Sequence, residues 1–369
     1  MAGPDFLILG GGVIGLATAY GLARAGASVS VVDAGSPGRA SPAAAGMLAP
    51  LAESAQPGPL LDLALDSLGR YPAFIAALNE DGGTQLTVDG PGMLRVARTV
   101  DEEASLCRAL AWQGALGLPL VRLSGAEARR LEPGLGPDVL AAVLSPAEKQ
   151  VEPRCLILAL QKACERCGVG LISGSVTRIE SDGDRAVSAV SDAGRHTFGA
   201  LVVAGGSWSG ALASLFGFDF PVFPLRGQIL ALGPQVPMPL RHTVYTHDAY
   251  LVPRADGRVV VGATEEWAGF VSETDSGAVA GLRAEAARLL PVLAAWPLHS
   301  AWAGLRPVSA DGLPLLGRVP GWANVHVATG HGRNGILLTP ATNALMAAHL
   351  LHDTPPPATF DPARFLEAS

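Results

Sequence analysis

The sequence predicts an α/β fold in which a doubly wound parallel sheet is assembled from three segments and a second domain is inserted between them. Short apolar strands alternate with helices near residues 1–50, 150–210 and 325–352, as a doubly wound sheet requires. Mixed β-rich stretches fill the intervals, and no low-complexity linker separates them. We therefore expect the two domains to share a large interface.

The chain opens with a βαβ unit. Phe6–Leu9 and Ser28–Val32 are apolar runs of strand length, and Val13–Ala25 between them has helical character. Gly26 follows at the position that glycine favours after a helix end. This unit is the usual start of a doubly wound sheet.

Later elements follow from the same kinds of pattern. We predict helices over 60–78, 154–166, 282–290 and 336–351, strands within 171–191, 200–204 and 325–328, and a hairpin over 250–262. The hairpin turns at Asp256-Gly257, and the strands of 171–191 are joined at Asp182-Gly183-Asp184. Residues 41–50 are small and turn-forming, so we expect a loop there.

Composition limits the class of protein and its partners. Hydrophobic residues make up 49% and charged residues 16% of the 369, which excludes general disorder. The net charge is −7 and no basic block is interleaved with aromatics, so we expect no nucleic-acid partner. The apolar stretch 6–22 is interrupted by glycines, and residues 1–5 carry no basic side chain. We therefore expect neither a signal peptide nor a membrane span.

The four cysteines indicate a reducing compartment. They are too few for a disulfide framework of this length. Cys164 and Cys167 have the spacing of a metal or redox pair, but no second such pair follows, so we expect two reduced thiols on one helix and no metal site. A cytoplasmic location is the corresponding prediction.

A dinucleotide-binding motif follows the first strand. Gly10-Gly11-Gly12-Val13-Ile14-Gly15 fits G-x-G-x-x-G, and Asp33 lies 18 residues after Gly15, where it would accept hydrogen bonds from a ribose. Gly10 permits the turn, Gly12 the approach of a pyrophosphate and Gly15 the packing of helix on strand. The motif alone does not distinguish NAD from FAD. The small residues of 41–47 suit a flat ring, which favours FAD.

Two C-terminal stretches contain candidate substrate-binding arginines. Trp302-Ala303-Gly304-Leu305-Arg306-Pro307 places Arg306 beside a rigid proline, and Gly330–Ile336 contains Arg333. Arginine binds carboxylates through two parallel hydrogen bonds. The helix expected from Ile336 would direct its positive N-terminal end at a flavin and stabilise the negative charge of its reduced form.

Taken together, the motifs resemble the glycine oxidase group of the D-amino-acid oxidase family of flavoproteins. The resemblance is carried in order by Gly10–Gly15, Ala43–Pro50, Trp208–Gly210, Arg226–Gln228, Tyr250–Arg254, Trp302–Pro307 and Arg333–Leu338. It implies non-covalent FAD in a Rossmann-like domain, together with a substrate domain built on an antiparallel sheet. The implied boundaries are 1–80, 146–217 and 303–369 for the FAD domain, and 81–145 and 218–302 for the substrate domain.

The resemblance also assigns site residues. Arg306 corresponds to the arginine that binds the substrate carboxylate, Tyr250 to the tyrosine that assists it, and Arg333 to a second arginine near the substrate. With the glycines of the motif, the implied FAD contacts are Gly10, Gly12, Val13, Ile14, Gly15, Asp33, Ala34, Ala40, Ser41, Ala45, Gly46, Met47, Val176, His331, Gly332, Arg333, Asn334, Gly335, Ile336 and Leu337.

Three positions depart from the family pattern. Asp33 stands where relatives commonly carry Glu, which keeps a carboxylate for the ribose. Gly332 stands where an aromatic residue is usual, and Asp248 where some relatives have His. The last two leave the substrate open between glycine and a bulkier N-substituted glycine or amino acid.

The implied reaction is oxidation of the carbon–nitrogen bond of glycine or an N-substituted glycine to the imine, with O₂ reduced to hydrogen peroxide. Arg306 and Tyr250 would orient the carboxylate, no general base is required, and His331 would orient backbone. Two alternatives stay open: a D-amino-acid or secondary-amine dehydrogenase that passes electrons to a carrier, and a flavin-binding protein without activity. A flavin linked to a C-terminal cysteine is excluded, since Cys167 is the last cysteine. The sequence leaves open a homo-oligomer.

Overall fold

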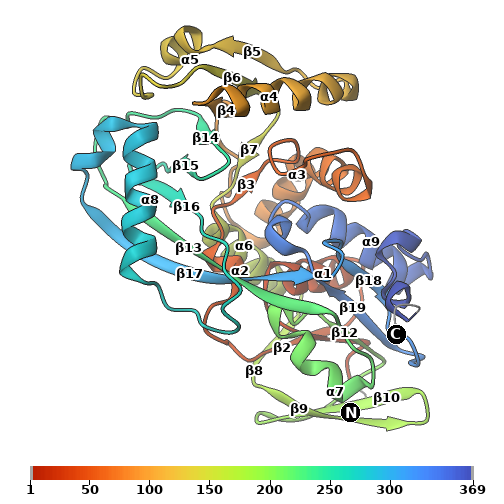
Figure 1. Cartoon of the computed structure of the whole chain (residues 1–369). Helices are drawn as coiled ribbons and strands as arrows, with labels where there is room; N and C mark the ends of the chain where they lie inside the picture. Colours follow the sequence, from red (N-terminus) through yellow and green to blue (C-terminus); the bar gives the residue numbers. More distant parts are fainter. Residues whose placement is uncertain (1–2, 367–369) are drawn as a thin grey trace.

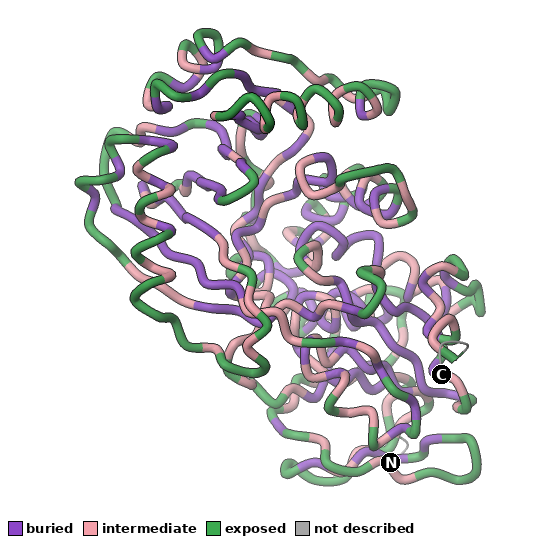
Figure 2. Tube along the Cα trace, viewed as in Figure 1, coloured by how far each residue is buried: buried purple, intermediate pink, exposed green. Residues whose placement is uncertain are grey.

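Two large sheets organise the chain in this computed structural model (Figure 1), which describes residues 3–366. Met1 and Ala2, the start of the N-terminal stretch considered above, lie outside that range. One sheet has six strands in the order β18-β19-β12-β1-β2-β8, and the other has eight in the order β17-β13-β16-β15-β14-β4-β6-β5. Buried residues follow the strands of both sheets, whereas the outer helices alternate buried and exposed positions (Figure 2). Across residues 3–366, no helix combines the length and apolarity that a bilayer crossing needs.

The six-stranded sheet has the doubly wound form predicted from the sequence. All neighbouring strands are parallel except β18, which runs antiparallel to β19. Both faces of these strands are buried, which explains their continuous apolar runs: Ile8 packs in the cluster formed with the long helices, and Leu7 packs in another cluster with Ala186 and Phe220. The strands are β1 (Phe6–Leu9), β2 (Val29–Asp33), β8 (Gly170–Ser173), β12 (Ala200–Val203), β18 (Leu315–Arg318) and β19 (Val325–Thr329). The predicted strands at 6–9, 28–32, 200–204 and 325–328 are thus confirmed within one residue at each end.

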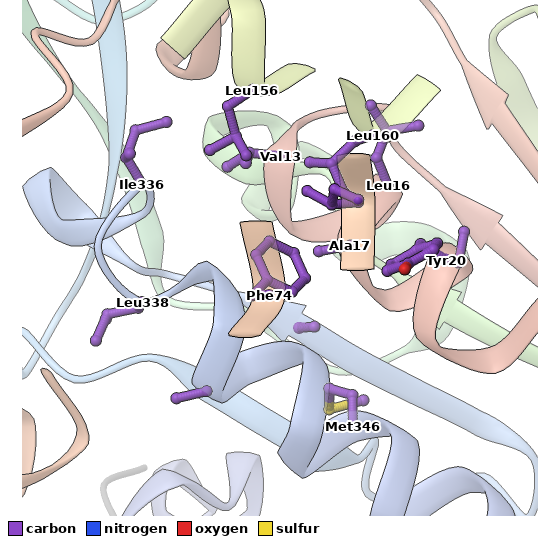
Figure 3. Close-up of a cluster of buried hydrophobic side chains, with 14 of the residues drawn as sticks. Val13, Leu16, Ala17, Tyr20, Phe74, Leu156, Leu160, Ile336, Leu338 and Met346 are labelled. Carbon is purple, nitrogen blue, oxygen red and sulfur yellow. The ribbon is translucent and has the colours of Figure 1, made fainter. Parts of the chain in front are cut away.

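Four helices bury one core beside this sheet. They are α1 (Val13–Arg24), α3 (Pro59–Gly82), α6 (Pro153–Arg166) and α9 (Thr339–His352). Figure 3 shows Leu16 and Tyr20 of α1 among Phe74, Leu160 and Met346 of the other three helices, all of them buried. Burying side chains of this size stabilises the fold by about 1.5–3 kcal/mol each.

The eight-stranded sheet is antiparallel except where β14 runs parallel to β4. Its strands are β4 (Met93–Ala97), β5 (Val121–Ser124), β6 (Ala141–Ser145), β13 (Val222–Leu232), β14 (Thr243–Tyr245), β15 (Tyr250–Pro253), β16 (Val259–Gly262) and β17 (Leu298–Ser309). The predicted hairpin is confirmed as β15 and β16. Helices α4 (Val100–Gln113), α5 (Gly125–Leu131) and α8 (Ser276–Leu289) contact its strands. Helix α8 begins six residues before the predicted start, because the Asp275 carboxylate accepts a hydrogen bond from Ala278 N and caps it.

Shorter elements connect the two sheets. The predicted loop 41–50 is wrong in part: it contains the end of α2 (Ala40–Ala43) and the strand β3 (Met47–Leu48), which pairs with β7 (Lys149–Gln150). A three-stranded ribbon comprises β9 (Val176–Asp182), β10 (Arg185–Ser191) and β11 (Gly194–Thr197), with the predicted turn at Gly183 confirmed. The remaining helical pieces are α7 (Ala213–Phe216) and the single turns η1 (Gly114–Leu116), η2 (Gly206–Trp208), η3 (Gly210–Leu212), η4 (Pro291–Ala295), η5 (Gly332–Asn334), η6 (Ala358–Phe360) and η7 (Pro362–Phe365).

Helix α9 begins at Thr339, so the predicted start at Ile336 is wrong. A helix that began there would need residue 340 to donate its N–H to the Ile336 carbonyl, and Pro340 has none. That carbonyl instead accepts a hydrogen bond from the Tyr71 hydroxyl at 2.5 Å, and the Leu337 carbonyl accepts one from Ser67 Oγ at 2.6 Å. The stretch before α9 is therefore a series of turns, with Leu338 N donating to the Asn334 carbonyl at 2.8 Å, that is bound to α3.

Two buried histidines join β19 to α9. His326 Nδ1 lies 3.0 Å from His349 Nε2, and the side chains are almost fully buried. Burial, with His349 and Arg318 nearby, lowers the pKa of His326 to about 3. The folded protein therefore holds His326 neutral at pH values where an unfolded chain protonates it.

We expect the free energy of unfolding to fall as the pH drops below about 6.5, the pKa of histidine in an unfolded chain. In this range the unfolded state binds more protons than the folded state, so acid favours unfolding down to a pH of about 3. Urea unfolding at pH 7 and pH 5 measures the slope. His326→Gln reduces it, whereas the exposed His299→Gln leaves it unchanged. Equal slopes in all three proteins would contradict this account.

Candidate active site

A cavity of about 350 Å³ lies between the two sheets. The residues that follow β1, β2, β12 and β19 line one side, and Ile229, Tyr250 and Arg306 of the eight-stranded sheet line the other. In doubly wound folds, ligands bind at the carboxyl ends of the parallel strands. The strand order of the first sheet therefore determines where the cavity forms.

The glycine-rich turn after β1 shapes one end of the cavity. Gly10 has a φ of +114°, which other residues rarely adopt, and a side chain there would overlap the Ala204 carbonyl. The N–H of Val13 donates to Ser41 Oγ at 3.1 Å. Free N–H groups and the partial positive charge at the start of α1 suit a phosphate group here.

Asp33, at the end of β2, lies next to this turn. A Cβ atom placed on Gly11 would come within 2.7 Å of Asp33 Oδ2. The same oxygen accepts a hydrogen bond from Arg39 Nη1 at 2.8 Å, and Oδ1 accepts one from Gly35 N at 3.2 Å. The carboxylate is thus oriented beside the phosphate-binding turn, as a ribose acceptor requires. Sequence reasoning did not single out Arg39.

The structure brings nearly all predicted cofactor residues to this one cavity. Gly15 and Leu337 are the exceptions among them. Gly15 packs against the Gly10 carbonyl, and Leu337 is buried with its carbonyl bound to Ser67. The predicted residues that line the cavity are Gly10, Gly12, Val13, Ile14, Asp33, Ala34, Ala40, Ser41, Ala45, Gly46, Met47, Val176, His331, Gly332, Arg333, Asn334, Gly335 and Ile336.

Two side chains, one from β17 and one directly after β15, bind the small-residue segment 43–47. Trp302 Nε1 donates to the Ala43 carbonyl at 2.9 Å, and Arg254 Nη2 donates to the Ala45 carbonyl at 2.5 Å. Arg254 is itself held by Glu152 at 3.1 Å. These contacts keep the backbone of 43–47 exposed to the cavity. Both residues lie in motifs that carried the family resemblance, but their contacts with 43–47 were not predicted.

Arg306 and Tyr250 lie across the face of the eight-stranded sheet. A Cβ atom on Gly227 would lie 2.5 Å from the Arg306 guanidinium, and one on Gly262 would overlap the Tyr250 ring. Glycine at both positions therefore makes room for the two side chains. Burial raises the pKa of Tyr250 to about 12 even though Arg306 opposes the shift, so the hydroxyl keeps its proton.

Arg306 retains donors toward the cavity. Its Nη1 donates to the Thr264 carbonyl at 3.0 Å, and the described residues form no ion pair with it. A guanidinium has five N–H donors, so most of them stay available to a carboxylate.

Arg333 is engaged differently, because two carboxylates bind it. Its Nε forms an ion pair with Glu53, and its Nη1 lies 3.1 Å from Glu265 Oε1. Glu53 follows β3 in a stretch with no recognisable motif, so sequence reasoning missed both glutamates. Of the three residues predicted to act on the substrate, Arg333 is the one with anionic partners.

His331 is buried and is not suited to act as a general acid or base. Its Nε2 lies 3.0 Å from Thr342 Oγ1, and burial lowers its pKa to about 3. Its main chain pairs with Val308 of β17. These contacts orient the backbone that leads into Gly332 and Arg333.

The cysteines lie away from the cavity. All four have free thiols, and none lines the cavity. Burial raises the pKa of the Cys164 thiol to about 12, so this thiol is unreactive. Within residues 3–366, no group of three or more metal-ligating side chains gathers.

The glycine turn, the oriented Asp33 and the arginine–tyrosine pair define a dinucleotide-dependent oxidoreductase. Residues 5–349 match the FAD dependent oxidoreductase family, and the chain belongs to this family. It therefore binds FAD, as the exposed backbone of 43–47 favoured, and the predicted resemblance is confirmed.

Similar proteins cover nearly the whole chain. It is 36% identical over 371 residues to the bifunctional protein ThiO/ThiG of Synechocystis sp., with 98% of this chain and 54% of that protein covered. The chain thus spans about half the length of that relative. It is 35% identical to the glycine oxidase of Geobacillus kaustophilus, with 93% and 92% covered. The crystal structure of glycine oxidase from that organism superposes with a TM-score of 0.93 at 32% identity, over 99% of both chains.

A buried polar cluster supports the backbone beside the cavity. Glu148 Oε1 accepts a hydrogen bond from Leu51 N at 2.7 Å, while Arg95 Nη1 and Gln113 Nε2 donate to the Leu51 carbonyl at 3.4 and 2.9 Å. Burial raises the pKa of Glu148, and the nearby Arg95 guanidinium opposes that shift. The two charges stabilise each other where water is excluded.

We expect Arg95→Met to destabilise the fold by about 3–5 kcal/mol, because it leaves the Glu148 carboxylate buried without its partner charge. Urea unfolding measures the loss. The double variant Arg95→Met/Glu148→Met removes both charges and should recover part of the stability. A loss below about 1 kcal/mol, or a double variant as unstable as the single one, would contradict this expectation.

Proposed function

We propose that this chain is an oxidase of glycine or an N-substituted glycine, which converts the carbon–nitrogen bond to an imine and reduces O₂ to hydrogen peroxide. The observation that carries the proposal is Arg306 beside the protonated Tyr250 in the cavity of an FAD-binding protein. Glycine oxidase relatives at about one-third identity support it.

The chain's own groups fit FAD. We propose that the turn Gly10–Ile14 and Ser41 hold the pyrophosphate, that Asp33 holds a ribose, and that 43–47 and 331–336 border the flavin. Bound FAD supplies the two-electron oxidation of the amine and the transfer of those electrons to O₂. The four cysteines lie away from the cavity, which supports non-covalent binding.

Arg306 and Tyr250 orient the substrate. The guanidinium binds the α-carboxylate through two parallel hydrogen bonds, and the Tyr250 hydroxyl donates a further one. The Thr264 carbonyl holds Arg306 from its other side. The amine enters in its neutral form, so the reaction needs no general base, and His331 serves only to orient backbone.

Four finer statements belong to this proposal. The domain division is 1–80, 146–217 and 303–369 for FAD, and 81–145 and 218–302 for the substrate. Free thiols on all four cysteines support a reducing, cytoplasmic location. The electron acceptor is O₂ rather than a carrier, and a homo-oligomer is compatible with the site.

We expect Arg306→Leu to lower kcat/KM for carboxylated amines by roughly 30-fold to several-thousand-fold, because losing one side of a desolvated charge pair costs about 2–5 kcal/mol. Steady-state peroxide release measures the loss. Flavin absorbance should show FAD still bound, and heat denaturation should release it as free FAD. Arg306→Lys keeps the charge but loses the paired donors, so its kcat/KM should lie between those of the unchanged protein and of Arg306→Leu. A leucine variant within threefold of the unchanged protein contradicts the role of Arg306.

Gly332 leaves space open in the cavity wall. A Cβ atom there would have no neighbour within 4 Å, and Gly332 lies beside Arg333 among the lining residues. An aromatic side chain buries about 150–250 Å², so its absence leaves room for a sizeable group. We propose that an apolar substituent on the substrate nitrogen or α-carbon occupies this space.

N-Hexylglycine should be oxidised with a higher kcat/KM than glycine or sarcosine, because each buried CH₂ contributes about 0.8 kcal/mol. Gly332→Phe should remove this preference by filling the space. The φ of +54° strains any side chain at this position, so Gly332→Ala is the matched control for strain without bulk. The proposal is contradicted if the unchanged protein prefers free glycine to N-hexylglycine as substrate. It is also contradicted if Gly332→Ala and Gly332→Phe change the oxidation of N-hexylglycine equally.

A further inference from the structure

The cavity wall contains a second arginine whose charge is already neutralised within the protein. Arg333 forms ion pairs with Glu53 and Glu265, whereas Arg306 has a carbonyl partner only. Burial raises the pKa of Glu53, and Arg333 and Arg306 are both close enough to oppose that shift. They therefore present different chemistry to one ligand: Arg306 offers an unpaired cation, and Arg333 does not.

The two glutamates differ in burial. The Glu53 side chain is 7% exposed and lines the cavity, whereas that of Glu265 is 50% exposed and lies outside the lining. Exposed ion pairs contribute little because water screens them. Glu53 is thus the partner that neutralises Arg333 inside the cavity.

The backbone holds Glu53 in place. Its N–H donates to the Ala49 carbonyl at 3.1 Å, and the N–H groups of Leu51 and Ala52 just before it donate to the buried Glu148 at 2.7 and 3.1 Å. Because these contacts restrain the segment, Glu53 has little freedom to leave Arg333 when a ligand enters.

We propose that Glu53 is a specificity-determining residue that excludes substrates with a second carboxylate. By occupying Arg333, it leaves Arg306 to bind the single α-carboxylate of the substrate. A second carboxylate near Arg333 would lie against the buried Glu53 carboxylate, and the two like charges would repel each other. The inference rests on the proposed function and adds to it the charge of the accepted N-substituent: neutral rather than anionic.

Two N-substituted glycines of nearly equal size test the proposal. N-Ethylglycine has a neutral substituent, and iminodiacetate has a carboxylate in the same place. We expect the unchanged protein to prefer N-ethylglycine in kcat/KM by about tenfold or more. Glu53→Gln should raise the iminodiacetate to N-ethylglycine ratio by about tenfold, because it frees the Arg333 charge. Glu265→Gln is the matched control, because it removes the same charge from a residue outside the cavity lining. Its iminodiacetate to N-ethylglycine ratio should stay within threefold of that of the unchanged protein.

Binding of ethers that cannot be oxidised separates this inference from the proposed function. Calorimetry on the FAD-loaded protein should show ethoxyacetate bound more tightly than diglycolate, and Glu53→Gln should reverse or abolish the difference. If Glu53→Gln does not retain FAD, Glu53→Ala replaces it in both experiments. The relative affinity of the unchanged protein for ethoxyacetate and diglycolate tests the proposal in either case. Equal binding of the two ethers by the unchanged protein, or an equal effect of both glutamine variants, overturns the role of Glu53. Failure to oxidise any glycine derivative, with the ether preference intact, overturns only the proposed oxidase.

Discussion

The attachment of the eight-stranded sheet to the segment 43–47 is the contact on which the site depends. Trp302 and Arg254 each donate to a carbonyl of that segment, and Ser41, two residues before it, accepts a hydrogen bond from Val13 N at the start of α1. Residues 43–46 of the segment are three alanines and a glycine, which are too small to fill the cavity themselves. The space for a flat cofactor therefore exists because two long side chains hold small-residue backbone at the junction of the sheets.

The positions of the charged side chains determine which end of the cavity can bind an anionic ligand group. Arg306 lies over Gly227 and Tyr250 over Gly262, so two glycines on neighbouring strands bring a cation and a neutral donor together. Arg333 has the same side chain as Arg306 but the opposite electrostatic setting, because Glu53 and Glu265 bind it. The fold has thus already supplied anionic partners to Arg333 and leaves that of Arg306 to the ligand.

Local sequence features predicted a large part of the architecture. The apolar strands 6–9, 200–204 and 325–328 and the hairpin 250–262 depend on patterns within a few residues, and they form as expected. The start of α9 was misplaced because it depends on Tyr71 and Ser67, which lie far away in the chain. Pro340 was a local clue, since it cannot donate to the Ile336 carbonyl.

The sequence by itself determined the dinucleotide class of the cofactor and the βαβ unit that binds it, because the glycine turn, the following helix and Asp33 are close neighbours in the chain. The family resemblance then predicted Arg306, Tyr250 and Arg333 as site residues, without their neighbours. Tertiary structure alone decided what surrounds each of them: Glu53 and Glu265 lie 280 and 68 positions from Arg333 in the sequence, yet both contact it. Ion pairs between distant segments leave no local pattern, because either charge is equally compatible with an exposed position until the chain folds.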